Sequence, residues 1–389
     1  MPARPEMTTS RRGFLRSLGA GVAAGAAIRW PLPALAGSVP FEPPREAESG
    51  GLIRLDSNEN AYGPLPKVAE AIKAAVSSSN RYPRMETRSL RERIAAFHHV
   101  KPEQVVLGCG STEILRVASF AFQGSGKQLI QAAPTFEAAE HYAQAAGSGV
   151  ISIHLAPAYD HDLERMLARV STTTTLVYIC NPNNPTASLT PRKDLEHFIS
   201  RLPASTMVLI DEAYHHFAGH PGMYTSFIDH PMEDDRVIVT RTFSKVYGLA
   251  GLRLGYAVAA PKLIEQMRRF ATETNVNAIV AQAAMAGLDD IDEVNEAVQR
   301  NDDDRQEFLN QALARQLKPI DSHANFAMMN TMHPAEELIR HFREHNVLIG
   351  RHFPPLDNYI RVSFGRPEEM QAFWQAWDAL PFAKEIMVH

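Results

Sequence analysis

Seven short apolar runs alternate with helical segments between residues 105 and 259, and no other feature of the sequence restricts the fold so strongly. The runs are Val105–Leu107, Gln128–Gln131, Val150–His154, Leu176–Ile179, Met207–Ile210, Val237–Thr240 and Tyr256–Ala259. Several are apolar without interruption, which is typical of strands whose two faces are both covered. The alternation therefore predicts an α/β fold with an open, mainly parallel, seven-stranded sheet and helices on both sides.

The pattern changes on either side of this region, which indicates more than one domain. We expect a large domain over residues 68–286. A charge-rich stretch with helical spacing follows over 289–316, and residues 287–389 as a whole predict a smaller mixed α/β domain. Residues 37–67 are predicted to form an extended arm and a segment of the small domain, because their first part is rich in proline and glycine.

The first 36 residues differ in composition from the rest of the chain. Ser10–Leu15 contains two adjacent arginines and leads into an apolar stretch, Ser17–Ile28, that is too short to span a bilayer permanently. The small-residue triplet Ala34–Ala36 follows. This arrangement resembles a bacterial twin-arginine export signal, so we expect cleavage after Ala36 and a periplasmic protein. A basic amphipathic start or an uncleaved anchor is the alternative.

The charge of the chain argues against one class of partner. It carries 39 basic and 44 acidic side chains, a formal net charge of -5. Proteins that bind nucleic acid need an excess of cations to hold the phosphate backbone. We therefore expect no nucleic acid partner and look instead for a small-molecule site.

Polar residues follow several of the predicted strands at the point where each strand ends. In sheets of this kind, ligands bind beyond the carboxyl ends of the strands. A small-residue turn, Gly108–Glu113, opens a helix there and could bind phosphate, although the same pattern also serves as a plain helix cap. Cys180–Thr186, Asp211–Tyr214 and Arg241–Lys245 follow three further strands. A lysine, an aspartate, an asparagine and two hydroxyl-rich turns are thus predicted to meet at one edge.

At this point the sequence resembles the fold-type I pyridoxal-phosphate (PLP) enzymes, and within them the histidinol-phosphate branch of the class I/II aminotransferases. The resemblance runs from about Leu55 to the C-terminus, and its order and spacing are highly specific. It rests on Asn58–Pro64, Arg81–Pro83, Asn184–Thr186, Asp211–Tyr214, Ser244–Lys245, Leu249–Arg253 and Tyr359–Arg361. It implies a large PLP-binding domain, a smaller C-terminal domain, and PLP as cofactor.

The resemblance also implies a role for individual residues. Lys245 would form the Schiff base with the cofactor and, when freed, move a proton at the substrate. Asp211 would keep the pyridinium nitrogen protonated. Tyr214 and Asn184 would hydrogen-bond the phenolic oxygen of the cofactor, and Phe136 would stack on its ring. Taken singly, a capping aspartate, a core tyrosine or phenylalanine and a turn asparagine are competing interpretations.

The remaining implied contacts concern the two anionic groups and the substrate. The cofactor phosphate would be held by Gly110, Ser111, Thr112, Thr242, Ser244 and Arg253, since arginine offers phosphate a bidentate fork. Tyr82 would reach in from a second subunit, which makes the active unit a homodimer. Arg361 would bind the substrate carboxylate. The candidates for contact with the substrate side chain are Arg351, His352, Tyr62, Asn58 and Asn60.

Two cysteines and four histidines invite other interpretations. Cys109 and Cys180 do not have the spacing of a zinc site, and the strand order of the family implies two free thiols. The adjacent histidines, His98–His99 and His215–His216, point in different directions on any regular element. We therefore expect solvent-facing or helix-capping histidines and no metal.

The preferred function is PLP-dependent transfer of an amino group from an L-amino acid or related primary amine to a 2-oxo acid by a ping-pong mechanism. Histidinol phosphate is a doubtful substrate for an exported enzyme. A PLP-dependent racemase, lyase or oxidase on the same fold is the alternative, because the same residues serve these reactions. A non-catalytic amine-binding protein is disfavoured by the intact Lys245 and Asp211. A nucleotide-dependent dehydrogenase is disfavoured because no G-x-G-x-x-G follows the first strand.

Overall fold

The computed structural model describes residues 51–218, 224–272 and 274–383. All of them belong to one of the two compact units into which the chain divides, residues 51–389. The predicted export signal, its cleavage site and the first part of the predicted arm lie outside the described residues. Within the described ranges, no helix is both long enough and apolar enough to cross a membrane.

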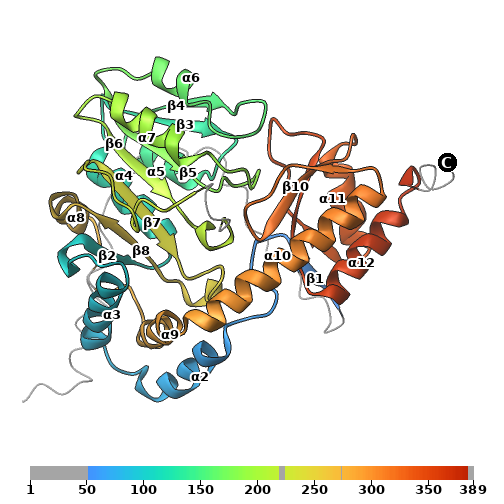
Figure 1. Cartoon of the computed structure of the whole chain (residues 1–389), viewed down its shortest axis with the longest axis horizontal. Coiled ribbons are helices and arrows are strands. Elements are labelled where there is room, and N and C mark those ends of the chain that lie inside the picture. The colour runs from blue at the N-terminus through green and yellow to red at the C-terminus, as the bar shows by residue number, and fades with distance from the viewer. Residues whose placement is uncertain (1–50, 219–223, 273, 384–389) are drawn as a thin grey trace, which may run out of the picture. The chain divides into compact units, whose positions relative to one another are not determined.

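A seven-stranded sheet forms the centre of the larger part of this unit (Figure 1). Its strand order is β2-β8-β7-β6-β5-β3-β4, and only β8 runs antiparallel to its neighbours. The strands are β2 (Val105–Gly108), β3 (Gln128–Ala133), β4 (Gly149–His154), β5 (Thr174–Cys180), β6 (Met207–Asp211), β7 (Val237–Thr242) and β8 (Gly255–Ala259). Each coincides with one of the apolar runs in the sequence, so the predicted sheet is confirmed.

Helices cover both faces of this sheet. Successive strand residues point to opposite sides, so an uninterrupted apolar strand has an apolar surface on each face. In β6, Val208 and Ile210 join the core on one face, whereas Leu209 joins the core on the other. The first core includes residues of α3, α7 and α9, and the second includes residues of α4, α5 and α8. The helices of this part are α2 (Pro66–Ala75), α3 (Arg84–Phe97), α4 (Ser111–Phe122), α5 (Ala138–Ala145), α6 (Leu163–Ala168), α7 (Arg192–Arg201), α8 (Pro261–Arg268) and α9 (Ala278–Asp289).

A separate core is built from the C-terminal residues and one short N-terminal strand. Leu55 of β1 packs in this core with Phe308, Val347 and Phe373, because β1 pairs in parallel with β11. The stretch predicted over 289–316 is α10, which begins where the Asp290 side chain accepts a bond from the Glu293 N–H. The elements are β1 (Ile53–Leu55), α10 (Ile291–Ala314), β9 (Lys318–Pro319), β10 (Phe326–Asn330), α11 (Ala335–Glu344), β11 (Val347–Ile349), β12 (Tyr359–Ser363) and α12 (Pro367–Asp378). Residues 56–62 therefore run from this core towards the ends of the large-sheet strands.

Four 3-10 turns connect these elements, and one of them contains a histidine pair. The turns are η1 (Val76–Ser78), η2 (Pro102–Gln104), η3 (His215–Phe217) and η4 (Ala250–Leu252). In η3, the rings of His215 and His216 lie 4.1 Å apart, and burial lowers the pKa of both, that of His216 to about 3. The expectation that this pair faces solvent or caps a helix was wrong, because the turn folds back against the core.

The other histidine pair ends α3. His99 is exposed, and His98 is the C-cap residue, as expected, but its ring is buried and its Nε2 lies 2.8 Å from the Tyr256 hydroxyl. Among the described residues, no group of three histidine, cysteine or acidic side chains could hold a metal ion. Cys109 and Cys180 are both free, since three strands separate β2 from β5 in the sheet.

Candidate active site

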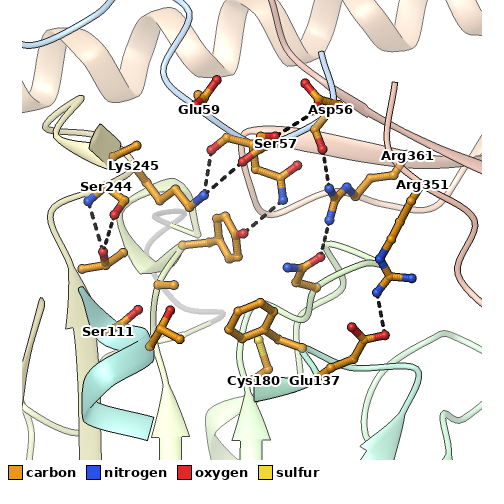
Figure 2. Close-up of a pocket in the computed structure, with 18 of the residues that line it drawn as sticks. Asp56, Ser57, Glu59, Ser111, Glu137, Cys180, Ser244, Lys245, Arg351 and Arg361 are labelled. Atoms are coloured by element: carbon orange, nitrogen blue, oxygen red, sulfur yellow. Dashed lines mark hydrogen bonds and ion pairs between the residues drawn. The ribbon is translucent and has the colours of Figure 1, made fainter. Parts of the chain in front are cut away.

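A pocket of about 720 Å³ lies where the large-sheet strands end, beneath the segment Asp56–Glu59 (Figure 2). The strand ends and the turns that follow them form its floor, and residues from α11, β11 and β12 form one wall. Its lining includes thirteen of the candidate site residues predicted from the sequence. They are Asn58, Ser111, Thr112, Phe136, Asn184, Asp211, Tyr214, Thr242, Ser244, Lys245, Arg253, Arg351 and Arg361.

Lys245 projects into the pocket from the turn after β7. Its Nζ donates to the carbonyl oxygen of Asn58 at 2.9 Å and lies 5.2 Å from the centre of the Tyr214 ring. Burial and the positive charge of Arg361 lower the pKa of Lys245 to about 7, against a smaller opposing effect of Glu59. A large fraction of this amine is therefore neutral near pH 7, and the neutral amine is the nucleophilic form.

Asp211 is the last residue of β6, and its carboxyl group is buried at the floor of the pocket. Oδ2 accepts a hydrogen bond from the Tyr178 hydroxyl at 3.0 Å, and Oδ1 accepts one from the Ala213 N–H at 3.2 Å. Burial raises the pKa of Asp211 to about 6, although the bond from Tyr178 opposes the shift. A cation brought next to this carboxyl group would favour its ionised form.

No sequence pattern distinguishes Tyr178 as a site residue. It lies inside an apolar strand, where a tyrosine is most simply explained as part of the core. One signal could have found it: strands that follow each other in the chain are usually neighbours in a sheet, which would place the hydroxyl of a tyrosine near the end of β5 close to the end of β6. The register brings Cys180 opposite Asp211, and Tyr178, two residues earlier in β5, lies on the same face of the sheet.

A group of hydroxyl, amide and guanidinium donors lies at the N-terminus of α4. Ser111 and Thr112 begin this helix, so their backbone N–H groups have no partner within it. Arg253 donates from Nη1 to the carbonyl oxygen of Ala250 at 2.9 Å, and its Nη1 lies 3.4 Å from the Ser244 Oγ. Gly110 has a φ of 78°, and a Cβ at this position would overlap the Arg253 guanidinium. Only glycine allows the turn and the arginine to approach so closely.

Arg361 reaches the pocket from β12 and joins three parts of the chain. Its Nη1 donates to Asn184 Oδ1 at 2.7 Å, and its Nη2 donates to the carbonyl oxygen of Asp56 at 2.6 Å. Its Nε is buried and has no hydrogen-bond partner among the described residues. Burial lowers the pKa of Arg361 to about 10, so the side chain remains a cation at neutral pH. An anionic ligand group would satisfy the unpaired donor.

The structure does not bring every predicted site residue to this pocket. Tyr82 is 80% exposed and lies outside the pocket of its own chain. Tyr62 donates to the carboxylate of Asp304 at 3.1 Å, and Asn60 donates to the carbonyl oxygen of Val246 at 3.0 Å. Both line a small separate cavity beside α10. His352 is paired instead with Asp357, at 2.8 Å from Nε2 to Oδ1.

The outer wall of the pocket comes from residues that the sequence analysis largely missed. Ile339 and Arg343 of α11 lie there with Ile349 and Phe353. Arg351, which was predicted, is paired with Glu137 at 2.6 Å from Nη2 to Oε1. In the sequence, the apolar members of this wall are indistinguishable from core residues of a helix and a strand. Their position depends on how the C-terminal core packs, which no local pattern reports.

Comparisons with known proteins show the family of this chain. Residues 51–376 match the aminotransferase class I and II family. The chain therefore belongs to this family, and it is a PLP-dependent aminotransferase, as the sequence predicted. Histidinol-phosphate aminotransferase 2 of Carboxydothermus hydrogenoformans is 37% identical over 344 residues, which cover 86% of this chain and 94% of the relative.

Two further proteins extend the comparison. The aromatic amino acid aminotransferase of Cutibacterium acnes is 37% identical over 283 residues, covering 72% of this chain and 79% of that protein. The crystal structure of histidinol-phosphate aminotransferase from Sinorhizobium meliloti in complex with pyridoxal-5'-phosphate superimposes with a TM-score of 0.79 at 27% identity. The superposition covers 86% of this chain and 90% of that one.

The residues in the pocket fit this cofactor. The close approach of Gly110 to Arg253 leaves a cation and several donors facing one point, which suits a phosphate group. Lys245 offers an amine of lowered pKa to an aldehyde, and Asp211 offers a buried carboxyl group to a ring nitrogen. Phe136 also lines the pocket and offers a ring face for stacking.

Proposed function

We propose that this pocket transfers the amino group of an L-amino acid, or of a related primary amine, to a 2-oxo acid by a ping-pong mechanism. The observation that carries the proposal is that Lys245 and Asp211 face the same pocket. An amine that binds an aldehyde reversibly and an acid that holds the ring nitrogen are both required, and neither is sufficient alone.

When bound, PLP supplies an aldehyde that captures amines and a ring that withdraws electrons from the substrate. Lys245 would hold the cofactor through its aldehyde and, as a free amine, would move the proton of the substrate α-carbon. The lowered pKa of its amine suits this exchange near neutral pH. Asp211 would hold the protonated ring nitrogen, which in turn would favour the ionised form of its carboxyl group, and Tyr214 and Asn184 would hold the ring oxygen.

The anionic groups are held at opposite ends of the pocket. Ser111, Thr112, Thr242, Ser244 and Arg253 bind the phosphate, with the Gly110 turn leaving space for it. Arg361 binds the substrate carboxylate, and its unpaired Nε supports this assignment. With the cofactor held at its phosphate and the substrate held at its carboxylate, the bond that breaks would be fixed relative to the ring.

The substrate side chain lies against the outer wall. Ile339, Ile349 and Phe353 provide apolar surface there, and Arg343 and Arg351 border it. Two of the relatives are named for histidinol phosphate and for aromatic amino acids, both of which carry a planar ring. We therefore expect an amine with a ring or other bulky apolar side chain. Export would separate the enzyme from histidinol phosphate, which favours a different amine.

The test mixes PLP-loaded enzyme with an equal amount of each primary amine of a panel. An amine that is a substrate should change the visible absorption. Addition of 2-oxo acids should then restore the spectrum and yield one new amino acid per active site. Arg361→Ala should weaken this half-reaction at least about 100-fold for α-amino acids, since it removes a charged hydrogen-bond donor. The matched control Arg343→Ala leaves the carboxylate site intact and should change the half-reaction much less.

Other outcomes of the same panel correspond to the alternative reactions. Loss of optical activity without amine transfer would indicate a racemase, ammonia release an elimination, and oxygen uptake an oxidase. Any of these in place of coupled transfer would contradict the proposal.

We extend the proposal to a homodimer in which Tyr82 of each subunit enters the pocket of the other. Tyr82, Met85 and Phe270 are exposed by 80%, 69% and 44%, and a dimer interface at this position would cover their apolar surface. Mixing Tyr82→Ala and Lys245→Ala subunits tests this. One of the two sites in the mixed dimer has both native residues, so activity should return. No return of activity from a mixed dimer would contradict a shared Tyr82.

We also propose that the twin-arginine segment exports the protein to the periplasm. Cell fractionation should find the shortened protein in the periplasm, and replacement of Arg11 and Arg12 by lysine should retain it in the cytoplasm. If the protein with its native signal remained in the cytoplasm, the proposal would be contradicted.

A further inference from the structure

Asn58 lies in the segment above the pocket and is the most connected residue of that segment. It is 2% exposed, and its φ of 53° is in the left-handed region, which asparagine tolerates better than most residues. Its carbonyl oxygen accepts hydrogen bonds from Lys245 Nζ at 2.9 Å and from Asn325 Nδ2 at 3.1 Å. Its backbone therefore touches the reactive lysine, and its side chain points elsewhere.

The side chain of Asn58 belongs to a hydrogen-bond chain that runs from Ser363 through the Asn58 amide to Tyr214. The backbone N–H of Asn58 donates to Ser363 Oγ at 2.8 Å, and Ser363 Oγ donates its single proton to Asn58 Oδ1 at 3.2 Å. This places the amide oxygen on the Ser363 side. The amide Nδ2 is left to donate to the Tyr214 hydroxyl oxygen at 3.0 Å. An amide N–H can only donate, so Tyr214 is the acceptor in this bond.

The consequence for Tyr214 is that its own proton is directed away from Asn58. Burial raises the pKa of Tyr214, so the hydroxyl keeps this proton. The ring is fixed edge-on against Phe326, with centroids 5.1 Å apart. Because Tyr214 lines the pocket, its O–H is free to donate to an acceptor there.

From this geometry we infer that Asn58, oriented by Ser363, is a positioning residue that makes the Tyr214 hydroxyl a hydrogen-bond donor towards the cofactor ring oxygen. The inference rests on the proposed function, in which that oxygen lies within reach of Tyr214. It adds a residue from the N-terminal segment and one from β12 to the control of the cofactor. The other charged groups around Tyr214 are Lys245, Arg361 and Asp211, and the roles proposed for them above do not change.

The chemical effect follows from which form of the cofactor the donor stabilises. A donor to the ring oxygen favours negative charge on that oxygen, and so favours loss of the proton shared with the lysine nitrogen. Without a fixed donor, the lysine-bound cofactor should hold this proton to higher pH. Removing Asn58 should therefore raise the pKa that governs the visible spectrum.

The experiment titrates the visible absorption of the PLP-loaded enzyme against pH. Asn58→Ala should raise the pH midpoint of the absorption change. The shift should correspond to a change of about three- to tenfold in the protonation constant, which is the range expected for the loss of one hydrogen bond. Tyr214→Phe should raise it at least as much. In the double variant, loss of Asn58 should add nothing, because Asn58 acts through Tyr214. The dissociation constant of PLP, measured in parallel, should rise in Asn58→Ala as well.

Two further variants separate this role from a general loosening of the segment. Asn325→Ala removes two bonds to the same segment, from Nδ2 to the carbonyl oxygens of Asn58 and Glu59, without touching Tyr214. It should shift the midpoint by less than about a third of the Asn58→Ala shift. Ser363→Ala keeps Asn58 but frees its amide to rotate, and should give a smaller shift in the same direction. It serves as the test if Asn58→Ala does not fold.

An equal shift in Asn325→Ala, or an undiminished effect of Asn58→Ala in the Tyr214→Phe background, would overturn the inference. A wild-type protein that gains no visible band with PLP would instead overturn the proposed function, so the two failures are distinguishable.

Discussion

Replacement of Asp211 by asparagine should make the protein without cofactor more stable, although it damages the site. The pKa of Asp211 is raised from 3.8 to about 6 by burial, so the folded state binds the proton more tightly than the unfolded state does. Between these two values the folded state holds more protons, and stability falls as the pH rises. Above pH 6 the full penalty for the buried charge is present.

The size of the effect follows from the two pKa values. A difference of about two pH units corresponds to about 3 kcal/mol at pH 8, and to about half as much at pH 5. Asparagine avoids this penalty and keeps both hydrogen bonds. Its oxygen accepts from the Ala213 N–H, and its Nδ2 can donate to the Tyr178 hydroxyl oxygen.

Urea denaturation of the cofactor-free proteins at pH 8 and pH 5 measures the effect. We expect Asp211→Asn to be more stable by up to about 3 kcal/mol at pH 8, with a smaller gain at pH 5. Binding of PLP should have the opposite effect on the comparison, because the variant lacks the charge that holds the ring nitrogen. PLP should therefore raise the urea midpoint of the variant less than that of the wild type. An Asp211→Asn protein that is less stable than wild type at both pH values would refute the reasoning.

Three further predictions follow from the same geometry. The rate of PLP binding to the cofactor-free enzyme should rise with pH around a midpoint near 7, because Lys245 with a pKa of about 7 reacts as the neutral amine; stopped-flow absorbance measures it, and a midpoint near 10 would contradict it. Glu212→Gln removes the nearer of two counter-charges of the buried Arg241, at 3.0 Å, and leaves Asp229 at 3.3 Å; it should lower the free energy of unfolding by about 1.5–3 kcal/mol, whereas Glu92→Gln in the exposed pair with Arg88 should change it by less than about 1 kcal/mol. Gly110→Ala places a Cβ against Arg253 and should weaken PLP binding at least about tenfold in an equilibrium titration, while Gly251→Ala, where a Cβ meets nothing within 4 Å, should not; equal affinities would argue against the proposed phosphate site.

The sheet and the residues at its edge could be predicted because both depend on local features of the sequence. A strand covered on two faces must be a short apolar run, and the polar residue that follows it must lie at the ligand edge of a parallel sheet. Asp211 and Lys245 were found in this way, and the pocket brings them together. The family resemblance then distinguished this chemistry from other uses of the same edge.

The contacts that orient these residues could not be predicted, because they join segments far apart in the chain. Asn58 contacts Tyr214 and Ser363 across 156 and 305 residues, and its left-handed backbone leaves no periodic pattern. Tyr178 has the sequence pattern of a core residue, and only the hydrogen bond to Asp211 distinguishes it. Apolar periodicity reports that a side chain is buried, and it does not report which polar group lies beside it.

The central claim is that Lys245 holds the cofactor in the pocket it shares with Asp211. Reduction of the PLP-loaded enzyme with sodium borohydride, followed by proteolysis and mass spectrometry of the peptides, tests it most directly. We expect one modified residue, Lys245, and loss of both the label and the visible band in Lys245→Ala. A label on another lysine, or an unchanged visible spectrum in Lys245→Ala, would contradict it.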